Sequence, residues 1–538
     1  MESTAIHNVE LVFVLLLLFV VVLAALAKRL HTPYPIILVI GGLILGFVPH
    51  APRVELNPDI VFLVIIPPLV FSAAFLTSWR DFRYNLISIS MLAFGLVGFT
   101  VFGVAAACRW ILPGFDWRMG LVLGAVVSTT DTIAAASIAK RVGLPKRIVD
   151  IIEGESLIND ATGLLALEFT VALLVTGRTP GFEEGAGRML YLILASVAIG
   201  LGIGKLMHFF ESKIDDASIE ITLTFLAPYM AYLAAEGVHS SGVLSTVACG
   251  LYLGNKSSFY FSRAARLRVE SVWDTVTFVL NGVVFVLIGL QLPYAIAEIS
   301  TAHLKHVMWL GLLFSAVVIV LRILWMYPGA WIANQIRHRI LGQPEPLPNP
   351  RAVFVVAWTG MRGVIALAAA LSLPTLLADG TRFPGRSLMI FLTFSVIFVT
   401  LVFQGLTLPP LIRWLGLSVN GRKNPEEQKA RRAMAEASLA YLEHAREGDA
   451  AEAGPMYEDL IRLQRRRLDL LEEKQSEEGG YSREEFERFR DLTAQVRSVQ
   501  RAALLNLRNH NAINDEVMRK LEREIDLVES RSASSEFL

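Results

Sequence analysis

Long apolar stretches separated by short polar breaks occupy most of the chain. A helix that spans a membrane needs about 20 mostly apolar residues, within a range of roughly 17–25. The pattern predicts an all-α polytopic membrane protein with about 13 transmembrane helices. The stretches lie near residues 10–27, 35–48, 59–76, 86–107, 118–138, 151–176, 188–208, 219–235, 241–254, 271–290, 305–327, 351–374 and 387–409. The short stretches near 35–48 and 241–254 are expected to tilt, break or lie partly at the interface, so the count holds to within one.

The last part of the chain has a different pattern. Residues 416–538 contain three segments with leucine-type residues at three- and four-residue spacing, which is typical of amphipathic helices. They are AEASLAYLEHA, YEDLIRLQRRRLDLLEEK and DEVMRKLEREIDLVES. We therefore expect a transmembrane domain over 1–415 and a cytoplasmic, charged, helical tail over 416–538. The tail has no catalytic motif, and it is interpreted as a helical bundle or dimer-associated module, with a regulatory sensor as the alternative.

Composition supports this division. Of the 538 residues, 54% are hydrophobic and 18% are charged, whereas about 25% charged residues are usual in soluble proteins. The formal net charge is zero, which gives no basic surface for nucleic acid. Charged residues number 46 among the 123 residues from Gly416 onward and 52 among the 415 before it. The two cysteines, Cys108 and Cys249, lie in apolar stretches, so they indicate neither a disulfide framework nor a zinc site.

Orientation follows from the basic residues between the stretches, because cytoplasmic loops are enriched in Lys and Arg. Basic groups fall on alternate loops, which places the N-terminus outside and the tail in the cytoplasm. They are Lys28–Arg29, Arg80 and Arg83, 140–147, Lys213, 256–268 and 337–351. The first apolar stretch is not expected to be a signal peptide, because the residues before it are acidic rather than basic.

Ionisable side chains inside apolar stretches are the candidates for function, because each costs at least about 2.5–3.5 kcal/mol near the bilayer centre. Five stand out: Asp131, Glu155, Asp160, Arg322 and Arg362. Together they are three acids and two arginines, so a fully ionised group would have one unbalanced negative charge. A proton or a monovalent cation can neutralise that charge in turn.

Asp160 is the first of these candidates. In GESLINDATGLL, Ser156 precedes Asp160 by one helical turn, and Glu155 and Asn159 form a second pair of the same spacing. Hard cations prefer oxygen ligands, and a carboxylate removed from water can hold either a proton or a cation. This helix therefore offers the groups that a cation/proton exchange needs.

Asp131 lies in the preceding stretch among Thr129, Thr130 and Thr132. Hydroxyl and Asp side chains compete for backbone hydrogen bonds, so this segment is expected to unwind within the membrane. Asp131 is either a cation ligand or, as we favour, a cap for the N-terminus of a half-helix.

The two arginines suggest buried partners. Arg322 interrupts SAVVIVLRILWMY, and Glu155 is its best partner if Asp160 stays free to titrate; a snorkelling interfacial position is the alternative. Arg362 is flanked by Gly360 and Gly363, where a second helix break is plausible. It would neutralise C-terminal carbonyls of a half-helix, and two interrupted spans in the two halves indicate an inverted-repeat transporter.

These segments resemble the bacterial Na⁺/H⁺ exchanger branch of the monovalent cation:proton antiporter superfamily. The resemblance spans roughly Leu11 to Leu415. The segments that carry it are STTDTIAAASIAKRVGLPKRIVDIIEGESLINDATGLL, FVLNGVVFVLIGLQLP and TGMRGVIALAAALSLP.

The resemblance implies a homodimer in which a six-helix core with two crossed, partly unwound helices moves like an elevator. It implies transport of Na⁺ and H⁺ without a cofactor, and the Asn159-Asp160 pair implies electroneutral one-for-one exchange. It assigns ion binding to Asp160, Ser156, Thr130, Asn159 and Asp131. Glu155 with Arg322 would be a structural ion pair, and Arg362 would belong to the second unwound helix.

Two positions depart from the family pattern. Ser72 stands where many relatives have a glutamate, and Thr132 stands where many have a proline. The sequence leaves open whether Na⁺, Li⁺ or K⁺ is preferred. A cation channel is the alternative from another class, and it would not need a titrating carboxylate coupled to cation movement. No nucleophile–base pair supports a hydrolase, so no enzymatic activity is expected.

Overall fold

The computed structural model describes most of the chain. The described residues are 2–48, 58–112, 114–176, 182–297, 304–340, 342, 347–377, 381–418, 425–448, 457–465 and short pieces between 468 and 525. They divide into two compact units, Met1–Asn420 and Gly421–Leu538. Within the described residues the regular secondary structure is helical, apart from one isolated β-bridge between Leu376 and Arg382.

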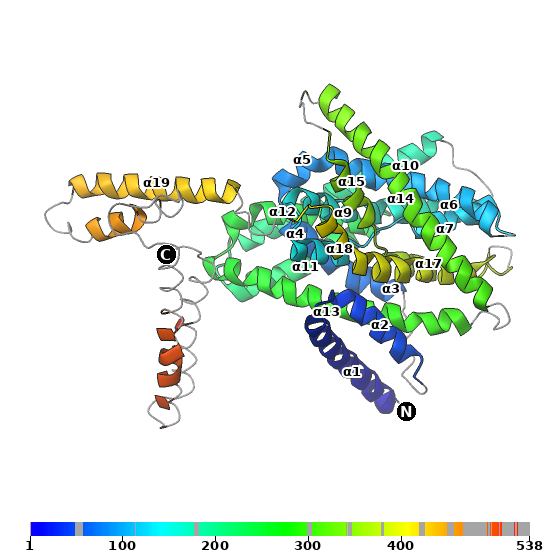
Figure 1. The fold of residues 1–538 in the computed structure, drawn as a ribbon, viewed down its shortest axis with the longest axis horizontal. Coiled ribbons are helices and arrows are strands. Elements are labelled where there is room, and N and C mark those ends of the chain that lie inside the picture. Colours follow the sequence, from blue (N-terminus) through cyan, green and yellow to red (C-terminus); the bar gives the residue numbers. More distant parts are fainter. Residues whose placement is uncertain are drawn as a thin grey trace. The chain divides into compact units, whose positions relative to one another are not determined.

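Eighteen α-helices make up the described part of the first unit (Figure 1). The first nine are α1 (Glu2–Arg29), α2 (Tyr34–Gly46), α3 (Pro58–Ile60), α4 (Ile66–Leu76), α5 (Trp79–Ser90), α6 (Val97–Ile111), α7 (Trp117–Val126), α8 (Thr132–Val142) and α9 (Lys146–Thr176). The rest are α10 (Phe182–Glu211), α11 (Ala217–Glu236), α12 (Gly242–Tyr260), α13 (Arg263–Ala297), α14 (Leu304–Ile340), α15 (Pro350–Trp358), α16 (Val364–Leu371), α17 (Arg386–Val399) and α18 (Gly405–Trp414).

Among the described residues, three π-helical turns join consecutive helices: η1 (Val61–Ile65) before α4, η2 (Met91–Leu96) between α5 and α6, and η4 (Thr400–Gln404) between α17 and α18. Eleven of the thirteen apolar stretches coincide with one helix or with such a consecutive series, and the stretches near 118–138 and 351–374 each cover two helices with a break between them. The stretch near 241–254 belongs to the longer helix α12, which continues to Tyr260.

Eight helices or continuous helical runs in the described residues are long and apolar enough to cross a membrane. They are Pro58–Leu76, Trp79–Ile111, Lys146–Val175, Glu183–Glu211, Ala217–Glu236, Arg263–Pro293, Lys305–Ile340 and Arg386–Trp414. Helices α2 and α7 are apolar but shorter. The count of about 13 crossings and the inverted relation of the two halves stay predictions.

Side chains with oxygen atoms begin several helices. Ser78 accepts a hydrogen bond from the N–H of Asp81 at the start of α5, and Ser241 accepts one from Leu244 at the start of α12. Such caps satisfy N–H groups that have no partner inside the helix. They fix where these helices start after each connecting loop.

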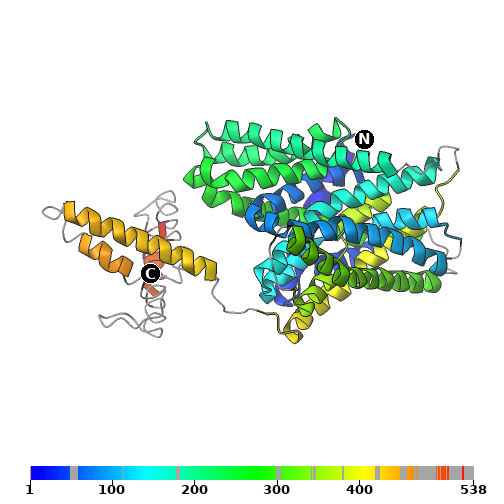
Figure 2. The ribbon, with the colours of Figure 1, turned by 90° about the horizontal axis from the view of Figure 1, so that it is seen from above.

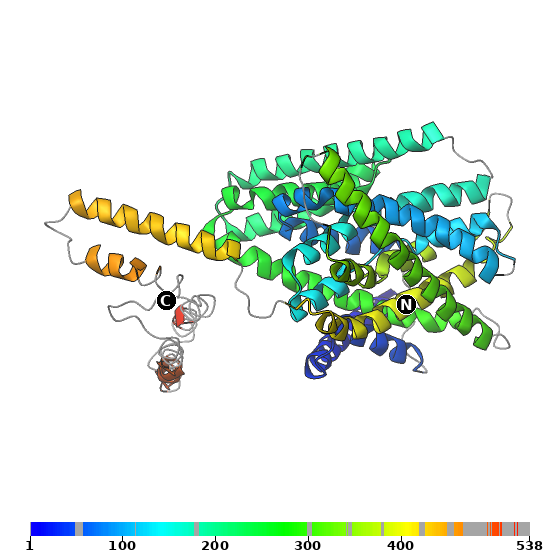
Figure 3. The same cartoon turned by 45° about the horizontal axis from the view of Figure 1, so that its top comes forward.

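The packing of α2 against α13 shows how close the helices approach. A Cβ atom on Gly42 would collide with the carbonyl oxygen of Val286, and one on Gly289 would collide with that of Val39. Small residues allow helix backbones this close in a membrane protein. Figures 1 and 3 both show α1 and α2, in dark blue, on one side of the first unit beside α13.

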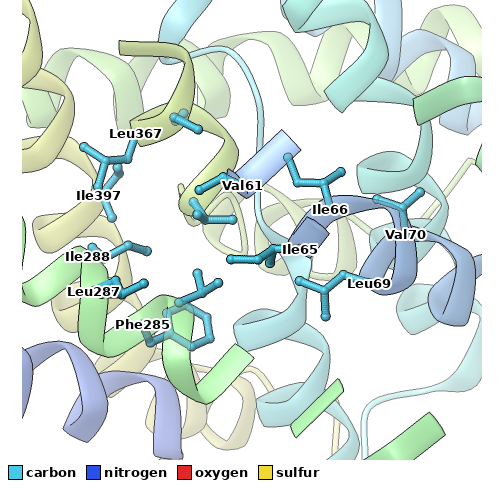
Figure 4. Packing of buried hydrophobic residues seen from close by; sticks show 14 of the residues in the cluster. Val61, Ile65, Ile66, Leu69, Val70, Phe285, Leu287, Ile288, Leu367 and Ile397 are labelled. Atoms are coloured by element: carbon cyan, nitrogen blue, oxygen red, sulfur yellow. The ribbon is translucent and has the colours of Figure 1, made fainter. Parts of the chain in front are cut away.

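The largest buried cluster joins elements that are distant in the sequence. Figure 4 shows Val61 and Ile65 of η1 near Phe285 of α13, Leu367 of α16 and Ile397 of α17. Helices α10, α11 and α12 pack against one another separately and form a layer at one side of the first unit in Figure 2. The buried clusters of the first unit thus include residues of the short helices α15 and α16 together with residues of long helices.

In the second unit, α19 (Pro425–Gly448) contains the first predicted tail helix. The described residues 457–465 are helical and begin the second, and Arg465 donates a hydrogen bond to Glu443 of α19 at 2.9 Å. Most of the third predicted helix, at 515–530, lies outside the described residues.

Candidate functional site

Two interrupted helices meet in the first unit. The chain is non-helical between the end of α7 at Val126 and the start of α8 at Thr132, and again between Trp358 of α15 and Val364 of α16. The backbone N–H of Asp131 donates a hydrogen bond to the carbonyl oxygen of Met361 at 2.8 Å. The two breaks are therefore joined directly, backbone to backbone.

Arg362 lies fully buried at the second break. Its Nη1 donates to the carbonyl oxygens of Ser128 and Thr129, at 2.9 and 3.0 Å. These carbonyls follow the C-terminal end of α7, where helical partners are lacking and the helix dipole is negative. The guanidinium therefore compensates the broken end of α7.

Arg322 does the same for the other interrupted helix. From α14, its Nε donates to the carbonyl of Ala357 at 3.0 Å and its Nη2 to that of Val356 at 3.1 Å, both in the last turn of α15. The remaining contacts of the guanidinium go to Glu155 of α9, at 2.6 Å to Oε1 and 2.8 Å to Oε2. Both side chains are buried, so this ion pair links α9, α14 and α15.

Asp131 lies where two half-helices begin. It directly precedes α8, and its carboxylate packs against Gly363, the residue that precedes α16. A Cβ atom on Gly363 would collide with that carboxylate. A negative charge is favourable at a helix N-terminus, so the position fits the capping alternative.

The polar side chains of α9 face the first break. The Thr130 hydroxyl donates to Oε1 of Glu155 at 3.0 Å and accepts a hydrogen bond from Nδ2 of Asn159. The Ser156 hydroxyl donates to the backbone carbonyl of Thr130 at 3.1 Å. Thr130 is thus held by three residues of α9.

Asp160 is set apart from this network. Its side chain is 5% exposed, and among the described residues it has no hydrogen-bond or ion-pair partner. The Oδ1 atom of neighbouring Asn159 is also buried without a partner. The nearby charges that act on Asp160 are those of Asp131 and Glu155, both negative. A carboxyl group and an amide oxygen at adjacent positions of α9 are therefore without partners among the described residues.

This arrangement suits a proton or a monovalent cation. Carboxylate, amide, hydroxyl and carbonyl oxygens are the ligands that hard cations prefer. In the part of the chain that the structure describes, no three His, Cys, Asp or Glu side chains come together as they would around a transition metal. The site thus brings together all eight residues that the sequence singled out for ion binding, pairing or helix breaks.

The two departures from the family pattern lie at helical positions. Ser72 is buried in α4, and its hydroxyl donates to the carbonyl of Leu69 in the same helix at 3.0 Å. Thr132 begins α8, and its side chain lies outside the described ones.

Sequence reasoning missed two polar residues of η4 beside this site. Thr400 accepts a hydrogen bond from the backbone N–H of Arg362 at 3.1 Å. Gln404 is fully buried, and neither of its amide atoms has a partner among the described residues. Both are uncharged and lie in an apolar stretch, so they lack the intramembrane charge that marks the other site residues in the sequence.

Comparison of this chain with known proteins shows the family to which it belongs. The family model for the transmembrane domain of sodium/hydrogen exchangers matches residues 14–414. An uncharacterized Na⁺/H⁺ exchanger of Mycobacterium tuberculosis is 32% identical over 524 residues, which cover 96% of this chain and 95% of that protein. The uncharacterized Na⁺/H⁺ exchanger YjcE of Escherichia coli is 30% identical over 97% of this chain and 98% of that protein.

A solved structure shows the same fold. The sodium proton antiporter MjNhaP1 from Methanocaldococcus jannaschii aligns with a TM-score of 0.59 and 16% identity, over 79% of this chain and all of that one. The family match and the near full-length relatives confirm the resemblance drawn from the three sequence segments. The chain therefore belongs to the sodium/hydrogen exchanger family, a family of multi-pass membrane antiporters.

Proposed function

We propose that the protein exchanges Na⁺ for H⁺ across the membrane and that Asp160 binds the two alternately. The observation that supports this most strongly is the buried Asp160 carboxylate, which has no hydrogen-bond or ion-pair partner among the described residues. An uncompensated carboxylate away from water is costly. Either a proton or a sodium ion removes that cost, so the two ligands compete for one group.

The neighbouring oxygens would complete the cation site. The Ser156 hydroxyl uses its proton on the Thr130 carbonyl, which leaves the lone pairs of its oxygen available. The Thr130 hydroxyl keeps one lone pair after its bonds to Glu155 and Asn159. Asn159 contributes its unpaired Oδ1. Asp131 we assign mainly to capping α16.

Glu155 and Arg322 would hold the site in shape, and Arg362 would compensate the broken end of α7. Neither arginine is placed to neutralise Asp160 permanently, because each donates hydrogen bonds to Glu155 or to backbone carbonyls and neither forms an ion pair with Asp160 in the described residues. Asp160 is therefore the acid left over among the three acids and two arginines.

We further propose a homodimer that works by an elevator-type movement, with electroneutral exchange and a cytoplasmic tail, in a bacterial inner membrane. The Asn159-Asp160 pair supports electroneutral exchange through the family resemblance, which also supports a bacterial inner membrane. The alternation of basic loops supports a cytoplasmic tail through the positive-inside rule. K⁺ is the second candidate ion. A Bacillus subtilis antiporter named for sodium, potassium, lithium and rubidium is 31% identical over 74% of this chain and 61% of that protein.

The test is transport by the full-length protein in proteoliposomes. A Na⁺ gradient should drive proton movement in the wild type, and Asp160→Asn should abolish it while the protein stays folded. Glu168→Gln is the matched control, because Glu168 lies on the same helix but is exposed and pairs with Arg188. Cation-driven proton flux in Asp160→Asn would overturn the assignment, and Na⁺ flux without proton movement in the wild type would indicate a channel.

Competition gives a second readout from the same vesicles. If Na⁺ and H⁺ bind one carboxylate, the apparent KM for Na⁺ should fall as pH rises, because fewer protons compete. Repeating the titration with Li⁺ and K⁺ ranks the cations. An apparent KM that is independent of pH would contradict binding at a shared group.

A further inference from the structure

A second pair of buried acids lies outside the site described above. Glu211 ends α10 and Glu220 lies in the first turn of α11, and both side chains are fully buried. Their charges act on each other. The side chains around them belong to a separate hydrophobic cluster, formed by α4 and α10–α13, which includes Phe71, Met207, Ile221, Leu253, Phe261 and Trp273.

Most of the carboxylate oxygens in this pair lack a donor. Both oxygens of Glu211 and Oε1 of Glu220 are buried without a well-formed hydrogen bond. Oε2 of Glu220 accepts a hydrogen bond from the backbone N–H of Ser262 at 2.9 Å. Two adjacent carboxylates with one N–H donor between them cannot both stay ionised without a large cost.

Tyr260 supplies at most one further donor. Its hydroxyl lies beside Glu211 and also 3.1 Å from the carbonyl oxygen of Leu253, and it has a single proton to donate to one of the two. The four carboxylate oxygens of the pair therefore face no more than two donors, the N–H of Ser262 and the hydroxyl of Tyr260.

The other titratable groups around the pair do not neutralise it. On α10, His208 packs against Tyr260 with ring centroids 5.0 Å apart and the rings tilted by 59°, and its Nδ1 has no partner among the described residues. In the α10–α11 connection, Lys213 lies over the ring of Phe209 at 4.0 Å. From α12 the facing groups are Cys249, Tyr252 and Tyr260. From α13 and α4 the side chains in the cluster are apolar or aromatic: Ala265, Val269 and Trp273, with Phe71 and Phe75.

The absence of a nearby cation among the described residues leaves two candidate ligands, a proton or a metal ion. Neither carboxylate forms an ion pair in the described residues. A hard cation takes about six or more oxygen ligands, and beside the two carboxylates this otherwise apolar surrounding offers the Tyr260 hydroxyl. No metal-ligating group of three His, Cys, Asp or Glu residues occurs among them either. The surroundings therefore favour a proton.

We propose that Glu211 and Glu220 form a second proton-binding site, separate from the exchange site, which holds one proton. Its loss would leave two neighbouring anions between α10, α11 and α12 and would loosen the packing of these helices. The site would thus couple the stability of this helix layer to pH at the α10–α11 connection. This inference does not depend on what the protein transports.

Infrared spectroscopy of the full-length protein tests for the proton directly. In an Asp160→Asn background, the spectrum should contain a carbonyl band from a buried carboxylic acid, and that band should be lost in Glu211→Gln/Glu220→Gln. Glu270→Gln, at an exposed position of α13, is the matched control and should keep the band. The band should also persist when Na⁺ is added, because the proposed ligand is a proton.

Thermal unfolding as a function of pH gives an independent readout. The wild type should lose Tm as pH rises into the alkaline range, because deprotonation creates the second anion. Glu211→Gln removes that ionisation but keeps the shape of the side chain, so its Tm should change less with pH. Glu270→Gln should follow the wild type.

Either result can overturn the proposal. A band that is absent from the Asp160→Asn background, or unchanged in the double variant, would show that the pair holds no proton. A band that disappears on addition of Na⁺ would show a cation site instead. Equal Tm profiles for wild type and Glu211→Gln would refute the effect on packing. Neither measurement depends on ion exchange. A negative result for the Glu211–Glu220 site is therefore distinguishable from a negative result for the exchange function, which would be transport that persists in Asp160→Asn.

Discussion

Arg322 binds both carboxylate oxygens of Glu155, at 2.6 and 2.8 Å, and gives other N–H groups to the last carbonyls of α15. One buried side chain thus satisfies an acid of α9 and the end of an interrupted helix. Bidentate pairing of this kind fixes the orientation of both partners. The shape of the proposed ion site depends on this contact, although neither residue is proposed to bind the ion.

Glu155→Ala should strongly destabilise the protein. It leaves Arg322 charged and buried without its acid, a change that typically costs about 3–5 kcal/mol. We expect lower yield and a lower Tm in detergent. Glu168→Ala on the same helix removes an exposed pair and should leave the Tm almost unchanged. An unaltered Tm in Glu155→Ala would contradict the structural role of the pair.

Thr130→Val and Thr130→Ser should separate shape from hydrogen bonding. Valine keeps the volume but removes the hydroxyl between Glu155 and Asn159, and leaving such buried groups unpaired costs about 1–3 kcal/mol. We expect the apparent KM for Na⁺ to rise roughly ten-fold or more in Thr130→Val. Thr130→Ser keeps both hydrogen bonds and should stay near the wild type. Equal KM values in the two variants would argue against a role for the hydroxyl.

Gly363→Ala should disrupt the junction of the two breaks. The added methyl group would collide with the carboxylate and also with the Cβ atom of Asp131, so a rotation of that side chain does not remove the clash. We expect loss of exchange and a lower Tm. Gly202→Ala in α10 is the matched control, because nothing lies within 4 Å of a Cβ atom there and alanine favours a helix. Normal exchange in Gly363→Ala would show that the contact is dispensable.

Arg362→Gln should reduce exchange more than Arg386→Gln. Arg362 is fully buried and donates to carbonyls at the broken end of α7, whereas Arg386 is partly exposed and bonds carbonyls at the end of α16. Removing the buried charge leaves the Ser128 and Thr129 carbonyls uncompensated beside Asp160. Initial rates of Na⁺-driven proton uptake measure the difference. Comparable rates in the two variants would contradict a specific role for Arg362 in exchange.

Much of the fold could be predicted from the spacing of apolar residues alone. The polar cluster around Asp131 and the glycines beside Arg362 also indicated where helices would break, because both features weaken a helix locally. The π-helical turns gave no such signal. The stretch near 241–254 was expected to be short, but α12 continues to Tyr260, because residues beyond Gly254 remain helical despite their polarity.

The acid pair of Glu211 and Glu220 could not be predicted. Each lies at a helix end next to a charged connection, which is typical of an exposed residue. Their burial depends on Tyr260, Phe261 and Trp273, which lie 40 or more residues further along the chain. The spacing of residues along one helix indicates which side chains share a face of that helix. It gives no information about which side chains of another helix will bury them.

The sequence by itself determined which segments are helical, which charges lie inside them and which family the segments resemble, because apolar periodicity and membrane length are local properties. Tertiary structure decided which oxygen atoms remain free. Ser156 and Asn159 each form a hydrogen bond with Thr130, Arg322 pairs with Glu155, and Asp160 is left without a partner among the described residues. Hydrogen-bond donors are shared between helices far apart in the chain, so only their packing determines which carboxylate is left for an ion.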